Sequence, residues 1–414
     1  MRNRGYATLV IPVVIALVGA VALSLGLFLG APAFGKGVAH YVKVVEEVVH
    51  VVEERPDITH VSIPDSVRAV YMSQCAASSQ TFREEIVSLV EETEINALVI
   101  DIKDFTGTVS FNRTSENTVI LTGAGCVVPD MKEFIDYLHT KDIYVIGRIT
   151  VFQDPLYTSV YPEQAVQSRS SGTPWKDYKG LSFVDVGAKP FWDYIVNISR
   201  EATALGFDEL NFDYIRYPSD GPMSDVLFNH SDYTQRPVEL ERFFRYLEQK
   251  VRRPDPVGYS PVLSADLFGM TTTNKDDLTI GQVMERATPY FDYIAPMTYP
   301  SHYPQGFNGY ADPNKNVYGV IRYSMDRAIP RIESATTTIA ALAYEPIGTT
   351  TLYRKPARDR SLLRPWLQDF DYGGIYGPQE VRDQIQALYD VGITSWMLWA
   401  PSNRYTEAAL ERVQ

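Results

Sequence analysis

Residues 206–221, GFDELNFDYIRYPSDG, bring acidic, basic and aromatic side chains together at the expected end of a β-strand. Asp213 follows a short stretch in which apolar and polar residues alternate, and Arg216 comes three positions later. A carboxylate beside a cation stays ionised, and it can act as a nucleophile or a general base. Because burying such charges is costly unless they pair or contact water, the pattern favours a polar cleft over a closed core.

Charged and aromatic residues also follow the other apolar segments of the chain. One buried acid is usually a satisfied structural group, but acids and bases at several strand ends favour a shared cleft. The opposing interpretation is an ion-pair network that only closes the fold, with Asp101 and Asp154 paired to Lys103 and Arg148. We expect a cleft in which Asp213 and Asp266 are joined by substrate-binding side chains from Asp101, Lys103, Arg148, Asp154, Tyr214, Arg216, Tyr299, His302, Gln368, Asp369, Trp399 and Asn403.

The chemistry expected of this cleft uses carboxylates. The 6 His residues are scattered, the 2 Cys residues fit no metal-binding spacing, and the chain has no Gly-x-Ser-x-Gly elbow. We therefore predict no metal site and no cofactor. Glycoside hydrolysis needs one carboxyl group that stays protonated for the leaving group and a second that stays ionised. Trp and Tyr rings at the strand ends would offer flat apolar faces for sugar rings.

The elements that must position these residues alternate between short apolar strands and amphipathic helices. Strands are expected over residues 67–73, 97–104, 143–152, 209–218, 261–269, 293–301 and 395–403, with the seventh at either 337–345 or 362–370. Helices are expected near residues 81–92, 131–138, 190–205, 280–287, 317–329 and 378–392. Eight strands with intervening helices predict an α/β fold, a (β/α)₈ TIM barrel. An open doubly wound sheet is the alternative, but a Gly-rich nucleotide turn is absent.

The barrel model divides the acids of the opening segment between the two ends of one strand. Functional groups lie at the carboxyl ends of barrel strands, where Asp213 falls. Asp208 and Glu209 begin the same strand, so we expect them at the opposite end in a stabilising role. Leu210 and Phe212 should pack toward the helices.

The N-terminal region has the character of a membrane anchor. Residues 7–29 carry no charge and are long enough to span a bilayer, while Arg2 and Arg4 favour a cytoplasmic N-terminus. We expect a cytoplasmic tip and transmembrane helix over residues 1–34, a juxtamembrane stalk over 35–61, and the barrel over 62–414 outside the cytoplasm. The alternative is a cleaved signal peptide, for which residues 31–33 supply small side chains.

Composition narrows the class further. The 414-residue chain is 45% apolar and has a formal charge of −13, so it can build a large core and lacks the basic surface that nucleic-acid binding needs. Cys75 and Cys126 would form a disulfide outside the cell, or remain two unpaired thiols.

Seven blocks of the chain together resemble a known family. They span about Val67 to Tyr405 and read IDIKD, RITVFQDP, GFDELNFDYIRYPSDG, SADLFG, DYIAPMTYPSHY, LRPWLQDF and WMLWAPSNRYT. The chain is similar to the putative glycosyl hydrolase domain family, long catalogued as a domain of unknown function. That family is related to TIM-barrel glycoside hydrolases of the α-amylase and α-galactosidase type.

The resemblance implies roles for two acids. Asp213, ending strand four, would be the nucleophile, and Asp266, ending strand five, would be the general acid/base. It also favours residues 362–370 as strand seven, with an insertion at 335–360. A rival scheme uses strands four and seven, in which Asp213 works with Asp369 or Glu345.

These observations predict a membrane-anchored, extracytoplasmic glycoside hydrolase that acts on a surface or exported polysaccharide. A non-catalytic module that binds glycan or protein on the same barrel is the alternative. Transglycosylation also remains open, because it shares its first step with hydrolysis.

Overall fold

The computed structural model describes residues 58–113, 123, 125–255 and 257–413. The predicted tip and anchor, and most of the predicted stalk, lie outside the described residues. In the described part of the chain, no helix combines the length and apolar character needed to cross a bilayer.

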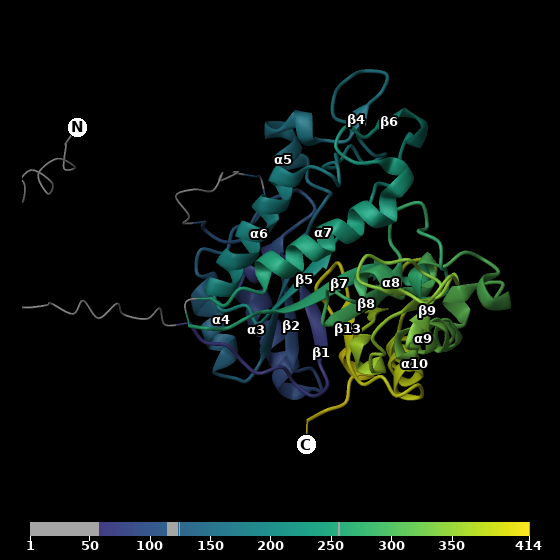
Figure 1. The fold of residues 1–414 in the computed structure, drawn as a ribbon. Coiled ribbons are helices and arrows are strands. Elements are labelled where there is room, and N and C mark those ends of the chain that lie inside the picture. Colours follow the sequence, from purple (N-terminus) through teal and green to yellow (C-terminus); the bar gives the residue numbers. More distant parts are fainter. Residues whose placement is uncertain (1–57, 114–122, 124, 256, 414) are drawn as a thin grey trace, which may run out of the picture. The chain divides into compact units, whose positions relative to one another are not determined.

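Eight parallel strands close into a barrel, which confirms the predicted fold class (Figure 1). Going round the barrel, β1 pairs with β2, and β13 pairs back with β1. The bounds of the strands are β1 (Arg68–Met72), β2 (Ala97–Lys103), β3 (Tyr144–Thr150), β5 (Glu209–Asp213), β7 (Val262–Phe268), β8 (Tyr293–Met297), β12 (Trp366–Gln368) and β13 (Trp396–Trp399).

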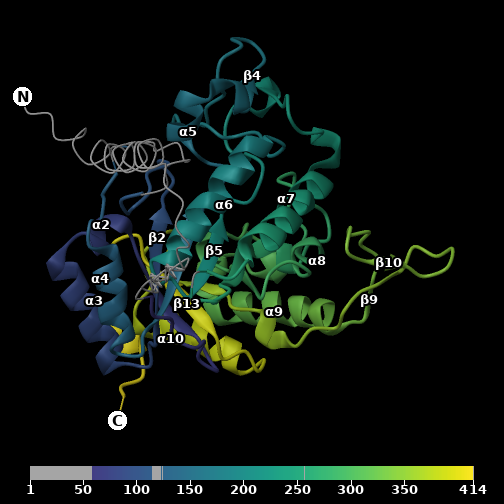
Figure 2. The same ribbon diagram turned by 60° about the vertical axis from the view of Figure 1, so that its left-hand side comes forward.

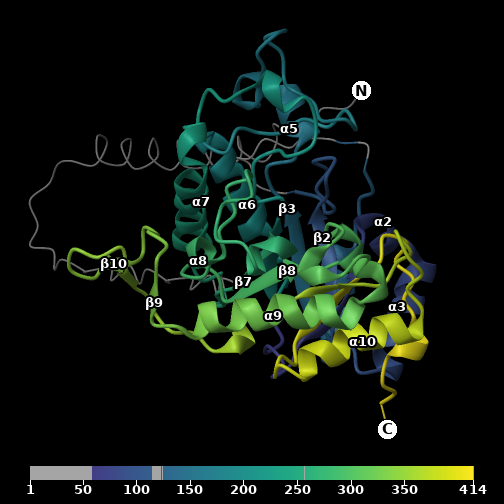
Figure 3. The ribbon, with the colours of Figure 1, turned by 90° about the vertical axis from the view of Figure 1, so that its right-hand side faces the viewer.

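Helices cover the outside of the barrel, with α6 beside α7 and α9 beside α10 (Figures 2 and 3). Their buried faces follow the expected helical spacing. The longer helices are α3 (Gln80–Glu92), α4 (Met131–His139), α6 (Lys189–Ala204), α7 (Arg236–Val251), α9 (Val317–Glu333) and α10 (Pro378–Tyr389), and the short ones are α2 (Gln74–Ala77), α5 (Pro155–Val160) and α8 (Met284–Ala287).

Helix α7 was not anticipated from the sequence. Its apolar positions, among them Leu240, Phe243, Leu247 and Val251, are buried at helical spacing, but most of the positions between them carry charged residues. The helix after β7 is shorter than expected, because the predicted segment 280–287 is helical only over Met284–Ala287.

The seventh barrel strand comes from the segment 362–370, as β12. The competing segment 337–345 lies outside the barrel. There, β9 (Thr336–Thr337), β10 (Glu345–Pro346) and β11 (Tyr353–Arg354) form a small antiparallel sheet. Figures 2 and 3 show this sheet projecting away from the barrel beyond α9.

Strand β5 separates the side chains of the opening segment as predicted. Leu210 and Phe212 join the core between the barrel and its helices, whereas Asn211 and Asp213 make contacts inside the barrel. The strand ends at Asp213 and not near residue 218, which corrects the predicted boundary. The reason is that Tyr214 adopts a left-handed conformation with φ of 50°, which interrupts the extended backbone.

The amino ends of the strands are closed by a fully buried ion pair. Arg364 Nη1 lies 2.8 Å and 3.0 Å from the two carboxylate oxygens of Glu209. Tyr144 Oη donates to Glu209 at 3.1 Å, and the Arg364 guanidinium lies 3.8 Å from the ring centroid of Tyr293. Asp208 accepts from the backbone N–H of Val145 at 2.8 Å. These contacts give both acids the stabilising environment expected at this end.

The structure pairs Cys75 with Cys126 in a disulfide, with Cα atoms 4.9 Å apart. The bridge ties the short helix α2, which follows β1, to the segment that precedes α4.

Candidate active site

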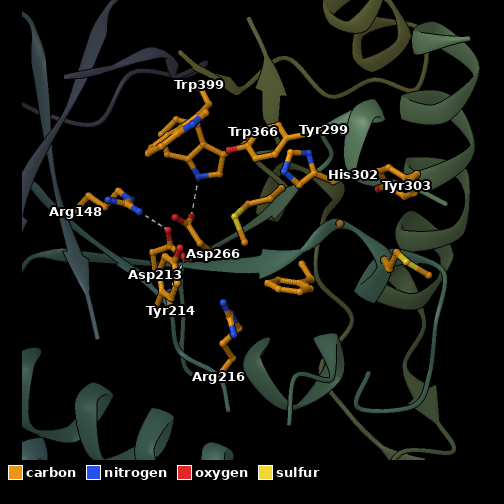
Figure 4. Close-up of a pocket in the computed structure, with 14 residues that line it drawn as sticks. Arg148, Asp213, Tyr214, Arg216, Asp266, Tyr299, His302, Tyr303, Trp366 and Trp399 are labelled. Atoms are coloured by element: carbon orange, nitrogen blue, oxygen red, sulfur yellow. Dashed lines mark hydrogen bonds and ion pairs between the residues drawn. The ribbon is translucent and has the colours of Figure 1, made fainter. Parts of the chain in front are cut away.

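A pocket of about 440 Å³ lies where the carboxyl ends of the barrel strands meet (Figure 4). Asp213 ends β5, Asp266 lies near the end of β7, and Trp399 ends β13. The pocket is lined by Arg148, Asp213, Tyr214, Arg216, Asp266, Phe268, Gly269, Met270, Met297, Tyr299, His302, Tyr303, Trp366 and Trp399. The two carboxylates therefore face one cavity, as the sequence analysis required.

Both carboxylate oxygens of Asp213 accept a hydrogen bond. Arg148 Nη2 donates to Oδ2 at 2.5 Å, and the backbone N–H of Tyr214 donates to Oδ1 at 2.6 Å. The second contact depends on the left-handed backbone of Tyr214, which costs about 1–2 kcal/mol in a residue with a Cβ atom. Strain of this kind collects at functional sites, where it fixes a reactive group in place. Asp213 is thus held in one orientation by two donors.

Arg148 is itself held by a second acid. Its Nη1 donates to Asp101 Oδ1 at 2.7 Å, and Tyr71 Oη donates to Asp101 Oδ2 at 2.5 Å. The guanidinium also lies 5.0 Å from the ring centroid of Trp399. Asp101 was expected among the substrate-binding residues, but it does not line the pocket. It orients Arg148, which in turn orients Asp213.

Asp266 has the opposite electrostatic character. Burial raises the pKa of its carboxyl well above the usual range, and the negative charge of Asp213 raises it further, whereas Arg148 opposes the shift. Asn211 Nδ2 and Trp366 Nε1 both donate to Oδ1 at 2.8 Å. Because both donors use Oδ1, a proton on this carboxyl would lie on Oδ2. Among the described residues no hydrogen bond to Oδ2 is formed, so this oxygen can serve a ligand.

Aromatic and apolar groups form the rest of the pocket wall. The Trp366 and Trp399 rings meet edge to face, with centroids 5.6 Å apart. Burial lowers the pKa of His302, so this ring is neutral near pH 7. Tyr372 packs against His302 with 5.7 Å between centroids and is 62% exposed, which places a flat ring at the pocket rim. Such surfaces suit the apolar faces of sugar rings.

Lys103 and Asp154 lie outside the pocket. Lys103 Nζ is 2.8 Å from Asp154 Oδ2, both side chains are fully buried, and Asp154 caps α5 by accepting from the N–H of Tyr157 at 2.7 Å. Lys103 was expected in the cleft, but the register of β2 against β3 shifts between Asp101 and Lys103. This irregularity breaks the alternation, and Lys103 points toward Phe191 of α6.

Three further residues that were expected to contact substrate instead connect loops at the carboxyl ends of the strands. Gln368 accepts from Ser301 Oγ at 2.8 Å, and Asp369 accepts from Thr406 Oγ1 at 2.6 Å. Asn403 accepts from the backbone N–H of Ser73 at 2.7 Å. None of the three predicted residues lines the pocket, because their polar atoms are used by neighbouring loops.

The structure does not bring the rival partners of Asp213 into the pocket. Asp369 is buried against Thr406, and Glu345 lies in the projecting sheet with its side chain 79% exposed. Of the acids proposed for catalysis, only Asp213 and Asp266 line the cavity among the described residues.

Sequence reasoning missed several lining residues. Trp366 was not among the expected site residues, yet its indole N–H needs an acceptor when buried and finds one in Asp266. The glycine at position 269 could have indicated a close approach of neighbouring groups. A Cβ there would come within 2.5 Å of Tyr303 Oη and 2.4 Å of the Met297 carbonyl oxygen. The other lining residues that were missed are Phe268, Met270, Met297 and Tyr303.

No cluster of three or more His, Cys, Asp or Glu that could hold a metal occurs in the described ranges.

A closed parallel barrel with two carboxylates and aromatic rings at its carboxyl ends has the design of a TIM-barrel glycosidase. The chain belongs to the family described as "Putative glycosyl hydrolase domain", whose model matches residues 69–405. This confirms the family resemblance. No curated protein sequence matches the chain.

The chain is similar to several solved structures. The glycoside hydrolase domain of PgaB (BpsB) from Bordetella bronchiseptica is 12% identical, with a TM-score of 0.56 over 84% of this chain and 99% of that one. A hypothetical protein from Ruminiclostridium thermocellum is 32% identical, with a TM-score of 0.41 over 48% of this chain and 96% of that one. The glycoside hydrolase domain of PelA from Pseudomonas aeruginosa is 11% identical, with a TM-score of 0.43 over 83% and 97%. The PgaB likeness supports the barrel architecture.

Proposed function

We propose that this protein hydrolyses glycosidic bonds of a polysaccharide, using Asp213 and Asp266 as its two carboxylates. The supporting observation is the electrostatic difference between two acids in one pocket. Asp213 accepts an ion-paired hydrogen bond from Arg148, whereas burial and the charge of Asp213 raise the pKa of Asp266 well above its usual range. Pairs of acids whose environments separate their protonation states can divide the roles of ionised group and proton donor.

In the proposed reaction, Asp266 Oδ2 gives its proton to the glycosidic oxygen as the bond to the anomeric carbon breaks. Asp213 attacks that carbon and forms a glycosyl ester. Asp266, now a carboxylate, removes a proton from water, and the resulting hydroxide attacks the anomeric carbon and releases Asp213. Arg148 stays paired with Asp101 throughout, so Asp213 remains oriented when its charge is consumed. This sequence retains the anomeric configuration.

The proposed location is the outer side of a membrane, with the chain attached by residues 7–29. The uncharged stretch, the positive residues before it and the disulfide support this placement, because disulfides persist in oxidising compartments. A surface or exported polysaccharide is then the accessible substrate. Protease treatment of intact cells should degrade the barrel, whereas protection until the membrane is permeabilised would contradict the proposed orientation.

The activity itself is tested by incubating the full-length chain with a broad panel of polysaccharides and following new reducing ends. We expect turnover of at least one glycan, and proton NMR at early times should show that the anomeric configuration is retained. An inverted product would reassign Asp213 as a base that activates water. Binding without turnover, unchanged in Asp213→Asn, would instead favour a non-catalytic glycan-binding module.

The pH dependence follows from the raised pKa of Asp266. The acid must be protonated in the free enzyme, so kcat/KM is expected to hold at pH values below this pKa and to fall as pH rises through it. Asp266→Asn should remove this alkaline limb and reduce turnover of natural glycans by about 10²–10⁴-fold. Nitrophenyl glycosides need little help from an acid and should lose much less. Equal losses on both substrate types would contradict the assigned role.

A further inference from the structure

Arg216 is a cation of the pocket for which the proposed reaction has no use. It follows Asp213 by three positions, and Figure 4 shows its guanidinium directed toward the cavity, near Asp213 and Tyr214. Its Nη1 donates to the Tyr217 carbonyl oxygen at 3.1 Å and to Ser219 Oγ at 3.4 Å. Within the described ranges, Nε and Nη2 donate to no acceptor and no carboxylate forms an ion pair with this guanidinium.

Arg148, the other arginine of the pocket, differs from Arg216 in having carboxylate partners in the part of the chain that the structure describes. Arg148 contacts two carboxylates, those of Asp101 and Asp213, at 2.7 Å and 2.5 Å. His302 carries no charge near pH 7, because burial lowers its pKa. Arg216 is therefore the lining cation without a carboxylate partner among the described residues.

Aromatic rings surround the Arg216 guanidinium. Its central carbon lies 4.8 Å from the ring centroid of Tyr214, 5.0 Å from that of Phe268 and 5.7 Å from that of Phe183. Ring faces attract a cation but do not neutralise it. Burial lowers the pKa of Arg216, yet an Arg side chain in a protein remains charged. The site thus holds a positive charge, partly removed from water, with its Nε–Nη2 edge free.

We propose that Arg216 binds a carboxylate of the substrate, so that the pocket accepts an acidic glycan built from uronic acid units. The proposal rests on the proposed hydrolase function and adds its substrate class. The free Nε and Nη2 groups form the planar edge that matches the two oxygens of a carboxylate. Asp213, Asp177 and Asp220 act on Arg216 from a distance, and a substrate carboxylate would add a direct ion pair. The rings beside it would contact the apolar face of the same sugar.

The test measures binding separately from catalysis. Full-length Asp266→Asn, which keeps the pocket while blocking proton donation, is titrated calorimetrically with oligosaccharides of galacturonate, glucuronate and mannuronate. Each is compared with its carboxyl-reduced counterpart, which has the same linkage and length without the charge. At least one acidic ligand should bind roughly 10- to 100-fold more tightly than its reduced form, the range of a charged hydrogen-bonded contact.

Variants in the same background assign the preference to one side chain. Arg216→Gln should abolish the preference for the acidic ligand, and Arg216→Lys should keep part of it, because a Lys retains the charge without the planar edge. Arg253→Gln is the matched control, since Arg253 is exposed between α7 and β7 and the substitution changes the net charge equally. This control should bind both ligands like its parent. Circular dichroism and thermal midpoints establish that each variant is folded.

The possible failures are distinguishable. Acid preference that survives in Arg216→Gln, or equal binding of acidic and reduced ligands, would overturn the role of Arg216. Tighter binding of sulfated than of carboxylated oligosaccharides would overturn the uronate assignment. If the wild-type chain preferred carboxylated ligands through Arg216 and still showed no turnover, that result would support the role of Arg216 and contradict the proposed hydrolase activity. Turnover of neutral glycans alone, unaffected by Arg216→Gln, would support the hydrolase and overturn the role of Arg216.

Discussion

Asp213→Asn is expected to reduce kcat on the order of 10⁴-fold, the scale seen when one member of a catalytic group is removed. The amide is nearly the same size and can still accept a hydrogen bond from Arg148, but it cannot attack an anomeric carbon. Ligand binding should change far less than turnover, because the aromatic wall and Arg216 are unaltered. Steady-state kinetics on the best substrate of the panel, together with calorimetric binding, measure the two effects separately.

Two variants control for loss of negative charge. Glu345→Gln removes an acid that is exposed in the projecting sheet, and kcat should stay close to that of the wild type. Asp369→Asn removes the buried acid that the strand-seven scheme would use, and it should lower stability more than it lowers kcat. If Asp369→Asn instead matched Asp213→Asn in a folded protein, the assignment of Asp266 would have to be abandoned. Thermal midpoints of all three variants identify any unfolding.

Arg364→Met is expected to lower the free energy of unfolding by about 3–5 kcal/mol, because it leaves Glu209 as a buried charge without its partner. Both side chains are completely buried, and Arg364 Nη1 contacts both oxygens of the carboxylate. Tyr144 supplies Glu209 with one remaining donor, which does not replace a positive charge. Denaturation in urea, followed by tryptophan fluorescence, gives the difference.

The matched control applies the same substitution to an exposed ion pair. Arg322 contacts Asp326 one turn along α9, with side chains 38% and 50% exposed, so Arg322→Met should cost less than about 1 kcal/mol. The double variant Arg364→Met with Glu209→Gln should be more stable than the sum of the single changes, since it leaves no unpaired charge. Strict additivity would mean that the two groups do not stabilise each other.

The sequence could predict which residues share the mouth of the barrel when their position followed from strand periodicity. Asp213 and Asp266 end apolar stretches, and parallel strands in a closed barrel bring such ends together. The same logic correctly placed Leu210 and Phe212 toward the helices. It did not place Lys103, because a local irregularity in strand pairing leaves no mark in the pattern of residue types.

Contacts between distant parts of the chain were also beyond sequence reasoning. Arg364 and Glu209 are separated by 155 residues, and no residue pattern near either position indicates that they pair. Trp366 is 100 residues from Asp266, and the residues around Trp366 do not indicate that its indole would donate to that acid. The six predicted residues that do not line the pocket are polar groups whose partners come from other strands or loops: Asp101, Lys103, Asp154, Gln368, Asp369 and Asn403.

The contacts of Arg148 join three neighbouring strands, since Asp101 belongs to β2, Arg148 to β3 and Asp213 to β5. A slip of one residue in any of these pairings would turn a whole set of side chains to the opposite face of the sheet. The geometry of the site therefore depends on the register of these strands. A barrel with a shifted register would be inactive even if it were compact. We expect changes in chain length to be tolerated in loops, whereas insertions within these three strands should abolish function.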